Sequence, residues 1–304
     1  MGESPGSTDP EAGANQGGGL TRRRVIVTAA GLVVAATAVG VATQIPGWLD
    51  DEPTEEELAA DRIFDANINE QGLSGYAKLI PDDNRQGLGY HLVPDPVGGG
   101  RQVARFTSRP GLTLGNEFPR SMVETEPIIK AAAHGNDNDV YFNGFSFYVL
   151  DGEFDRDTWI TLYTGGYGPP SNGPSLLGLM LVQHPEGGLM FRMGDDPQLL
   201  GNDVRVPTGR WVGVIQAYKY AYASNGGWVE MWVNTDGPWQ QVQINGENQP
   251  TLDVMRPNVT DGWYRNPSVP ASFSRIGVYG NRTYEAFFAT HRIARSFDAA
   301  DPLR

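Results

Sequence analysis

The sequence predicts an all-β protein with a two-sheet jelly-roll sandwich, preceded by a disordered and signal-like N-terminus. Three observations support this fold class. Glycine (39) and proline (22) are frequent, and charged residues make up 19% of the chain. From residue 63 onward, Gly, Pro, Asn and Asp interrupt short apolar or alternating runs, and helical periodicity is hard to find. No repeat of about 40 residues is visible, so a sandwich fits better than a propeller.

The N-terminus has the composition of an export signal. Residues 1–20 are rich in Gly, Ser, Pro and acidic residues, and we expect them to be disordered. Residues 21–43 contain Arg22-Arg23-Arg24 followed by an apolar run, which is the layout of a twin-arginine-type signal peptide. An uncleaved membrane anchor is the alternative interpretation of this segment. We therefore expect a secreted or cell-surface protein that meets a membrane only through these residues.

An acidic linker, residues 44–62, separates this segment from the jelly-roll domain, residues 63–304. Thr54 and Glu57 match a capping box, in which each side chain accepts a backbone N–H of the other residue. One or two helical turns can start there, although a solvated spacer is the simpler interpretation.

Charge and composition exclude several functions. The formal net charge is −13 and no Lys/Arg block or zinc-ligand spacing occurs, so nucleic acid is not an expected partner. The chain has no cysteine, so it has no disulfide, thiolate nucleophile or cysteine metal site. The Asp/Asn-rich stretch 135–139 could hold calcium, but it lacks the spaced glutamate of a known calcium loop. We therefore expect no cofactor, no metal and a monomer.

Nine runs predict the strands of the domain. In chain order they are RQVARFTS (101–108), FNGFSFYVL (142–150), TWITLYT (158–164), SLLGLMLVQH (175–184), GLMFRM (188–193), RWVGVIQAYKY (210–220), GWVEMWVN (227–234), FSRIGVYG (273–280) and YEAFFATHRIA (284–294). The turns Ser224-Asn225-Gly226 and 281–283 (Asn-Arg-Thr) predict two hairpins. The acidic stretch 153–158 lacks the glutamate spacing of a jelly-roll glycosidase, so we interpret it as a loop.

Strand 227–234 presents a mixed aromatic and polar face. Trp228, Glu230 and Trp232 alternate with apolar residues and therefore share one side of the strand. Indole rings interleaved with polar groups suit a groove that stacks sugar rings. The alternative is that the two tryptophans pack between the sheets.

The two faces of strand 273–280 differ in chemical character. Ile276 and Val278 point to one side and account for a buried face. Arg275 and Tyr279 point to the other side, where a purely structural strand needs neither a cation nor a phenol. The structural alternatives are an ion-paired arginine and a packed tyrosine.

The order of several segments resembles the concanavalin A-like polysaccharide lyases, especially the heparin-lyase-I-like and glucuronan-lyase-like group and more distantly the alginate lyases. The resemblance spans roughly 75–300 and is carried by RQVARF with PRSMVETEP, FNGFSFYV, GRWVGVIQAYKY with GGWVEMWVN, FSRIGVYGNR, and the tail HRIARSFDAADP. It implies a protein that cleaves a uronate-containing, acidic polysaccharide by β-elimination. A non-catalytic carbohydrate-binding or cell-surface module on the same fold is the alternative.

The resemblance also implies catalytic residues. An eliminating enzyme neutralises the sugar carboxylate with a cation or amide, and an acid/base group moves the proton. Tyr279 matches the acid/base position, Arg275 a carboxylate or sugar contact, and Arg120 the arginine of the family. Lys219 lies where the long strand enters the cleft, and His134 lies in a polar loop that could overhang it.

Six further residues are expected to contact substrate. They are Tyr163, Glu124, Trp232, Glu230, Arg282 and Gln183. One departure from the alginate lyases is plain, because their Gln-x-His pair has no counterpart on strand 158–164. That strand offers Thr161 and Tyr163 instead.

Overall fold

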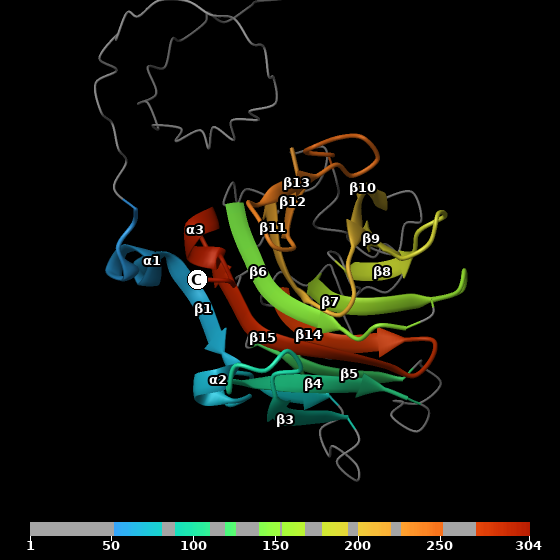
Figure 1. Cartoon of the computed structure of the whole chain (residues 1–304). Helices are drawn as coiled ribbons and strands as arrows, with labels where there is room; N and C mark the ends of the chain where they lie inside the picture. The colour runs from blue at the N-terminus through green and yellow to red at the C-terminus, as the bar shows by residue number, and fades with distance from the viewer. Residues whose placement is uncertain are drawn as a thin grey trace, which may run out of the picture. The chain divides into compact units, whose positions relative to one another are not determined.

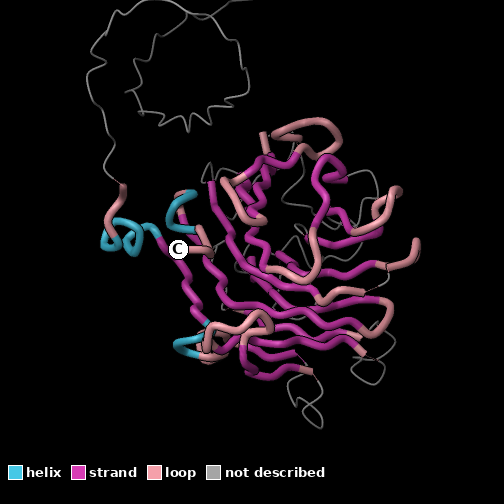
Figure 2. The backbone as a smooth tube through the Cα atoms, in the orientation of Figure 1, coloured by secondary structure: helices cyan, strands magenta, loops and turns pink. Residues whose placement is uncertain are grey.

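Two antiparallel sheets packed face to face form a jelly-roll sandwich, which confirms the predicted fold class (Figures 1 and 2). The computed structural model describes residues 52–80, 89–109, 119–125, 140–152, 154–167, 178–193, 200–219, 226–251 and 272–304. The expected disordered segment, the signal segment, His134 and the stretch 135–139 lie outside these residues. Among the residues described, no helix has the length and apolar character needed to cross a bilayer.

The first sheet has eight strands. Their order is β13 (Gln240–Val242), β12 (Trp228–Asn234), β11 (Trp211–Lys219), β6 (Val140–Val149), β15 (Tyr284–Ala294), β4 (Gln102–Ser108) and β3 (Tyr90–Pro94), with β1 (Arg62–Asn67) also paired to β15. Figure 1 shows this β1, near the start of the described chain, beside the late strand β15.

The second sheet has seven strands. Their order is β10 (Leu200–Val206), β9 (Leu189–Met193), β8 (Leu179–Gln183), β7 (Trp159–Tyr167), β14 (Ser272–Gly280), β5 (Arg120–Glu124) and β2 (Lys78–Ile80). Three short helices, α1 (Glu55–Asp61), α2 (Ile68–Gln71) and α3 (Phe297–Ala300), complete the described elements. Each of the nine predicted runs contains a strand.

The core lies between the two sheets because both turn their apolar faces inward. Phe145 and Phe288 of the eight-stranded sheet pack in one cluster with Phe191 and Ile276 of the seven-stranded sheet, and all four side chains are fully buried. Alternation along each strand leaves the other residues on two outer faces, which are the surfaces available for a ligand.

The capping box starts a real helix. Thr54 and Glu57 cap each other's backbone N–H groups at the start of α1. Leu58 in α1 is 5% exposed and packs with Ala299 and Ala300 of α3 on the outer face of the eight-stranded sheet. The folded unit therefore takes in residues that we expected to belong to a solvated linker, and it begins before the expected boundary at 63.

One of the two predicted hairpins is wrong. β11 and β12 pair directly, as expected. The turn at 281–283, however, does not join paired strands. β14 belongs to the seven-stranded sheet and β15 to the eight-stranded sheet, so the chain crosses the sandwich there. Local turn residues specify a reversal of direction but not which sheet receives the next strand.

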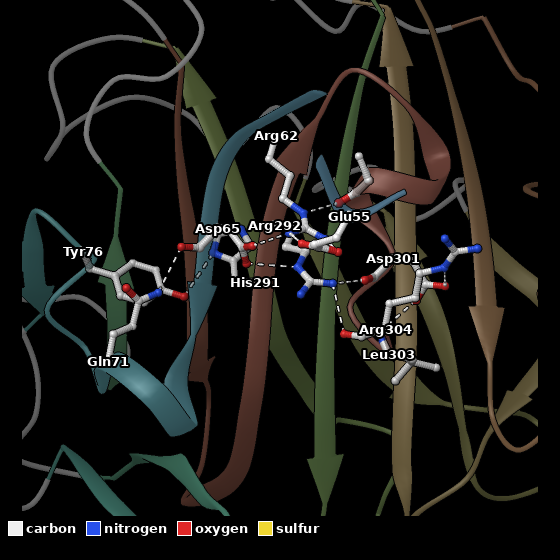
Figure 3. Close-up of polar contacts among 11 residues, drawn as sticks. Glu55, Arg62, Asp65, Gln71, Tyr76, His291, Arg292, Asp301, Leu303 and Arg304 are labelled. Atoms are coloured by element: carbon white, nitrogen blue, oxygen red, sulfur yellow. Dashed lines mark hydrogen bonds and ion pairs between the residues drawn. The ribbon is translucent and has the colours of Figure 1, made fainter. Parts of the chain in front are cut away.

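A buried polar cluster links the two sheets around His291 in β15. The His291 ring nitrogens lie 3.2 Å from the Tyr76 hydroxyl, 3.1 Å from Ser274 Oγ of β14, and 3.0 Å from Asn143 Oδ1 of β6. Figure 3 shows Tyr76 pointing toward His291. Burial lowers the pKa of His291 to about 3, so the ring stays neutral inside the protein.

This pKa makes stability depend on pH. The unfolded chain takes up a proton near the ordinary histidine pKa of about 6.5, whereas the folded protein does so only near 3. The His291 contribution is therefore complete above about pH 6.5 and falls by about 1.4 kcal/mol per pH unit below it. In His291→Gln this component is absent, so the stability gap between the wild type and the variant should narrow as the pH falls. Urea unfolding from pH 7 to pH 4.5 measures it, and a constant gap would contradict the buried neutral ring.

Candidate functional site

The candidate site lies on the outer face of the seven-stranded sheet, where β5 and β14 run side by side. Their register pairs Tyr279 with Arg120 and Arg275 with Glu124. The residues between them, Ile276 and Val278, are fully buried in the core, so these four side chains belong to the opposite face. We call this surface the Arg120–Tyr279 face.

Arg120 and Tyr279 are in direct contact. The Arg120 guanidinium carbon lies 5.2 Å from the centroid of the Tyr279 ring, which is cation–π geometry. Trp159 of β7 meets the same ring edge to face, with 5.2 Å between centroids. Burial lowers the pKa of Arg120 from its ordinary value, although the group stays cationic at neutral pH. A desolvated cation therefore lies beside a partly exposed phenol and an indole.

Arg275 and Glu124 neutralise each other. The Arg275 Nε donates to Glu124 Oε2, and the two side chains are 7% and 1% exposed. Burial lowers the pKa of Arg275, and the neighbouring Glu124 carboxylate acts in the opposite direction. The expectation that these residues contact substrate is therefore corrected, because each already holds the charge of the other in a buried pair. Lys78 of the edge strand β2 lies opposite Glu124 and adds a further cation to this row.

Strand irregularities decide which β7 residues reach this face. The register of β7 shifts against β14 and against β8 around residues 161–163. Leu162 and Tyr163 consequently both enter the core, and Tyr163 is 1% exposed and stacked on Phe145 at 5.7 Å. Burial raises the pKa of Tyr163 to about 12. The predicted substrate contact at Tyr163 is wrong for this reason.

Gly277 permits the register shift of β14 against β7, which falls between Ile276 and Tyr279. Its φ of 144° lies in a region that side chains rarely adopt, and an added Cβ would collide with the Ser121 carbonyl oxygen. The close approach of β14 to β5 at this point therefore requires glycine, and it keeps Arg120 beside Tyr279.

A hollow of about 480 Å³ extends the face at Trp159. Gln183, Asn281, Arg156 and Arg192 also line it. Arg192 of β9 contacts the Met180 sulfur at 3.1 Å, and its buried Nε has no hydrogen-bond partner in the described part of the chain. Sequence reasoning missed Arg192, although an arginine inside the apolar run GLMFRM was the available signal.

The remaining predicted residues lie elsewhere. Lys219, Glu230 and Trp232 belong to β11 and β12 of the other sheet. Trp232 is 7% exposed and meets Phe297 of α3 edge to face at 5.2 Å, so the predicted sugar-stacking groove is wrong because α3 covers it. Glu230 accepts a hydrogen bond from Gln249.

Two predicted contacts lie near the hollow or at the surface. Gln183 lines the hollow and donates to the Phe154 carbonyl oxygen at 2.7 Å. Arg282 is exposed and pairs with Asp155, in the acidic stretch that we interpreted as a loop. The described residues contain no group of three or more His, Asp or Glu side chains placed to hold a metal ion.

Comparisons with known proteins show distant likeness in structure. No protein-family model and no curated protein matches the chain. Among solved structures, a variant of the family 7 alginate lyase A1-II′ bound to product has a TM-score of 0.46 and 15% identity, over 77% of this chain and all of that one. Cellulose-induced protein Cip1 has a TM-score of 0.44 and 16% identity, over 77% of this chain and 97% of that one. The PL-14 alginate lyase of Aplysia kurodai has a TM-score of 0.43 and 11% identity, over 74% of this chain and 92% of that one. Likeness at this level defines no activity for this chain.

The ion pair makes a stability prediction. Glu124→Leu leaves the Arg275 guanidinium buried without its carboxylate and should destabilise the protein by about 3–5 kcal/mol. Arg275→Met should destabilise the protein by a similar amount, because it leaves the Glu124 carboxylate buried without its cation. The double variant replaces both charges by apolar groups and should lie much closer to the wild type. Urea unfolding of the four proteins measures this, and additive losses in the double variant would contradict the pairing.

Proposed function

We propose that this protein is a polysaccharide lyase that cleaves a uronate-containing glycan on the Arg120–Tyr279 face. The observation that carries the proposal is the contact between a partly buried cation and a phenol on neighbouring strands. β-Elimination needs these two functions together, one to stabilise charge on the sugar carboxylate and one to move the proton.

The chemistry assigns one task to each residue. The Arg120 guanidinium faces the uronate carboxylate and stabilises the negative charge that develops there. The deprotonated Tyr279 oxygen takes the proton from the ring carbon next to the carboxylate. The electron pair left behind forms a carbon–carbon double bond, and the glycosidic bond at the neighbouring carbon breaks. The leaving oxygen then takes the proton back from Tyr279, so the enzyme returns to its starting state.

The hollow beside Trp159 supports an acidic polymer as substrate. The partly exposed indole can lie against the C–H face of a sugar ring. Arg156 and Arg192 bring two cations to the same hollow, and Asp157 brings one carboxylate. This local excess of positive charge counters the overall charge of −13 where an acidic glycan would bind.

The proposal includes export. The arginine cluster before the apolar run in 21–43 supports delivery across a membrane. A large polysaccharide is met outside the cell, so secretion or display at the surface agrees with the proposed substrate.

A specific observation favours a second candidate, a carbohydrate-binding module without catalysis. None of the described histidines lies on the Arg120–Tyr279 face. His91 is in β3, His184 follows β8, and His291 is enclosed between the sheets. Thr161 and Thr164 are the polar residues that β7 pairs with Tyr279 and Arg275. Tyr279 must therefore serve as both base and acid, or the face binds glycans without cleaving them.

Ultraviolet absorbance distinguishes the two candidates, because elimination leaves an unsaturated uronyl end that absorbs. We expect absorbance to rise with at least one of glucuronan, alginate, heparin and hyaluronan. Tyr279→Phe should lower the rate by a factor of about 10² to 10⁴ while glycan binding persists. Tyr148→Phe, a change at a buried tyrosine in β6 of the other sheet, is the matched control and should leave the rate unchanged.

Two outcomes would contradict the proposal. If a glycan binds and no absorbance develops with any of the four, the protein is a binding module. If absorbance develops equally in the wild type and Tyr279→Phe, elimination occurs somewhere other than the Arg120–Tyr279 face.

A further inference from the structure

A second hollow, of about 210 Å³, lies on the outer face of the eight-stranded sheet. This face is on the other side of the sandwich from Arg120 and Tyr279. β1, β15 and β6 lie next to one another here and contribute Asn67, Thr290 and Ser146. Trp211, Arg101 and the C-terminal residues 302–304 line the rest of the hollow. We call it the Ser146 hollow.

A β-bulge brings the three polar side chains into one row. Asn67 pairs with Thr290 across β1 and β15. On the other side of β15, Phe288 pairs with Phe147 of β6 and His291 pairs with Phe145. Two residues of β15, 289 and 290, therefore lie opposite the single residue Ser146. Without this extra residue, Thr290 would point into the core. The bulge instead turns Thr290 outward and His291 inward.

These three side chains have no hydrogen-bond partner among the residues that the structure describes. Ser146 is 2% exposed, and its buried Oγ has no hydrogen-bond partner in the described part of the chain. Within the same residues, the side chains of Asn67 and Thr290 form no hydrogen bond either, and Thr290 is 8% exposed. A buried hydroxyl left unpaired is unfavourable, so Ser146 Oγ, beside the two polar side chains of Asn67 and Thr290 in the same hollow, indicates that something outside the chain supplies the partner.

The walls of the hollow are held firmly. The Trp211 Nε1 donates to Asp95 Oδ1 at 3.0 Å, and the Arg101 guanidinium lies 4.7 Å from the Trp211 ring centroid. Arg101 is itself paired with Asp95. The indole is therefore fixed at its nitrogen and covered by a cation, which limits its movement.

The C-terminal wall is fixed by a second set of contacts, shown in Figure 3. Arg292 donates to Asp65 at 3.0 Å and to the Asp301 carbonyl oxygen. Arg304 pairs with Asp298 at 3.3 Å, and the Leu303 N–H donates to Asp301 Oδ1 at 2.8 Å. The segment that closes the hollow is thus tied to β15 and β1 before any ligand arrives, which favours binding.

We propose that the Ser146 hollow is a second carbohydrate site, which binds one neutral sugar ring. Ser146, Thr290 and Asn67 can each donate and accept hydrogen bonds, as sugar hydroxyls do. Pro302, and the part of the Trp211 side chain that lines the hollow and is not covered by Arg101, offer apolar surface to the C–H groups of the ring. The hollow is smaller than the roughly 300–1,000 Å³ of pockets for drug-sized ligands, so it fits a single ring.

The charges in the Ser146 hollow favour a neutral ligand over a charged one. The two guanidiniums that line it, Arg101 and Arg304, are already paired with Asp95 and Asp298. An acidic sugar would have to compete with these carboxylates. The Arg120–Tyr279 face differs because Arg156 and Arg192 outnumber Asp157 in its hollow. The proposal concerns binding alone and does not depend on lyase activity.

Saturation-transfer NMR of the full chain with the methyl glycosides of glucose, galactose, mannose and xylose tests this site, with glucuronate as the charged comparison. We expect at least one neutral glycoside to bind saturably. Thr290→Val keeps the side-chain shape and removes the Thr290 hydroxyl, and Ser146→Ala removes the Ser146 hydroxyl. Each should weaken binding at least tenfold. Thr107→Val, on the same outer face but bonded to Glu285, is the control and should bind as the wild type does.

Other outcomes would overturn the site. These are the absence of binding by all four glycosides, unchanged binding in both hydroxyl variants, or glucuronate binding as tightly as the neutral sugars. Unfolding curves of the variants establish that they are folded. Lyase activity in Thr290→Val should equal that of the wild type, so failure of this site and failure of the proposed lyase function are separately visible.

Discussion

The antiparallel register between β5 and β14 is the constraint on which the candidate site depends. It sets Val123 against Ile276 in the core and, on the same strands, sets Arg120 beside Tyr279 and Glu124 beside Arg275 on the outer face. A slip of β14 by one residue would turn Arg275 and Tyr279 into the core and expose Ile276 and Val278. The buried ion pair and Gly277 both favour the observed register, because one requires a carboxylate opposite Arg275 and the other a close approach to β5.

The two outer faces of the sandwich have different chemistry because different elements cover them. Helices α1 and α3 pack on part of the eight-stranded sheet and bury Trp232 there, and the chain after α3 closes the Ser146 hollow. The described part of the seven-stranded sheet instead carries cations, with Arg120 next to Tyr279 and Arg192 next to Trp159. For this reason we propose an acidic polymer as the ligand of the second surface and a neutral sugar ring as the ligand of the first.

Local sequence patterns were sufficient for nine of the fifteen described strands and for the division of β14 into two faces. Alternation alone places Ile276 in the core and Tyr279 outside, and the Thr54–Glu57 spacing alone starts α1. The partners of these elements were not predictable. Glu124 and Arg275 are 151 residues apart, and no local pattern in either strand indicates the other. The irregularity that buries Tyr163 and the helix that covers Trp232 likewise arise from contacts between distant segments. Strict alternation therefore placed Tyr163 on the wrong face, and it placed Trp232 on the correct outer face without indicating that α3 covers it.

The central claim is that a uronate carboxylate meets Arg120 next to Tyr279. A crystal structure of the Tyr279→Phe protein with a bound uronate oligosaccharide tests it most directly, because that variant should hold substrate without turning it over. The account predicts a carboxylate within hydrogen-bonding distance of the Arg120 guanidinium and a neighbouring ring against Trp159. An oligosaccharide that lies elsewhere, with no carboxylate near Arg120, would contradict it.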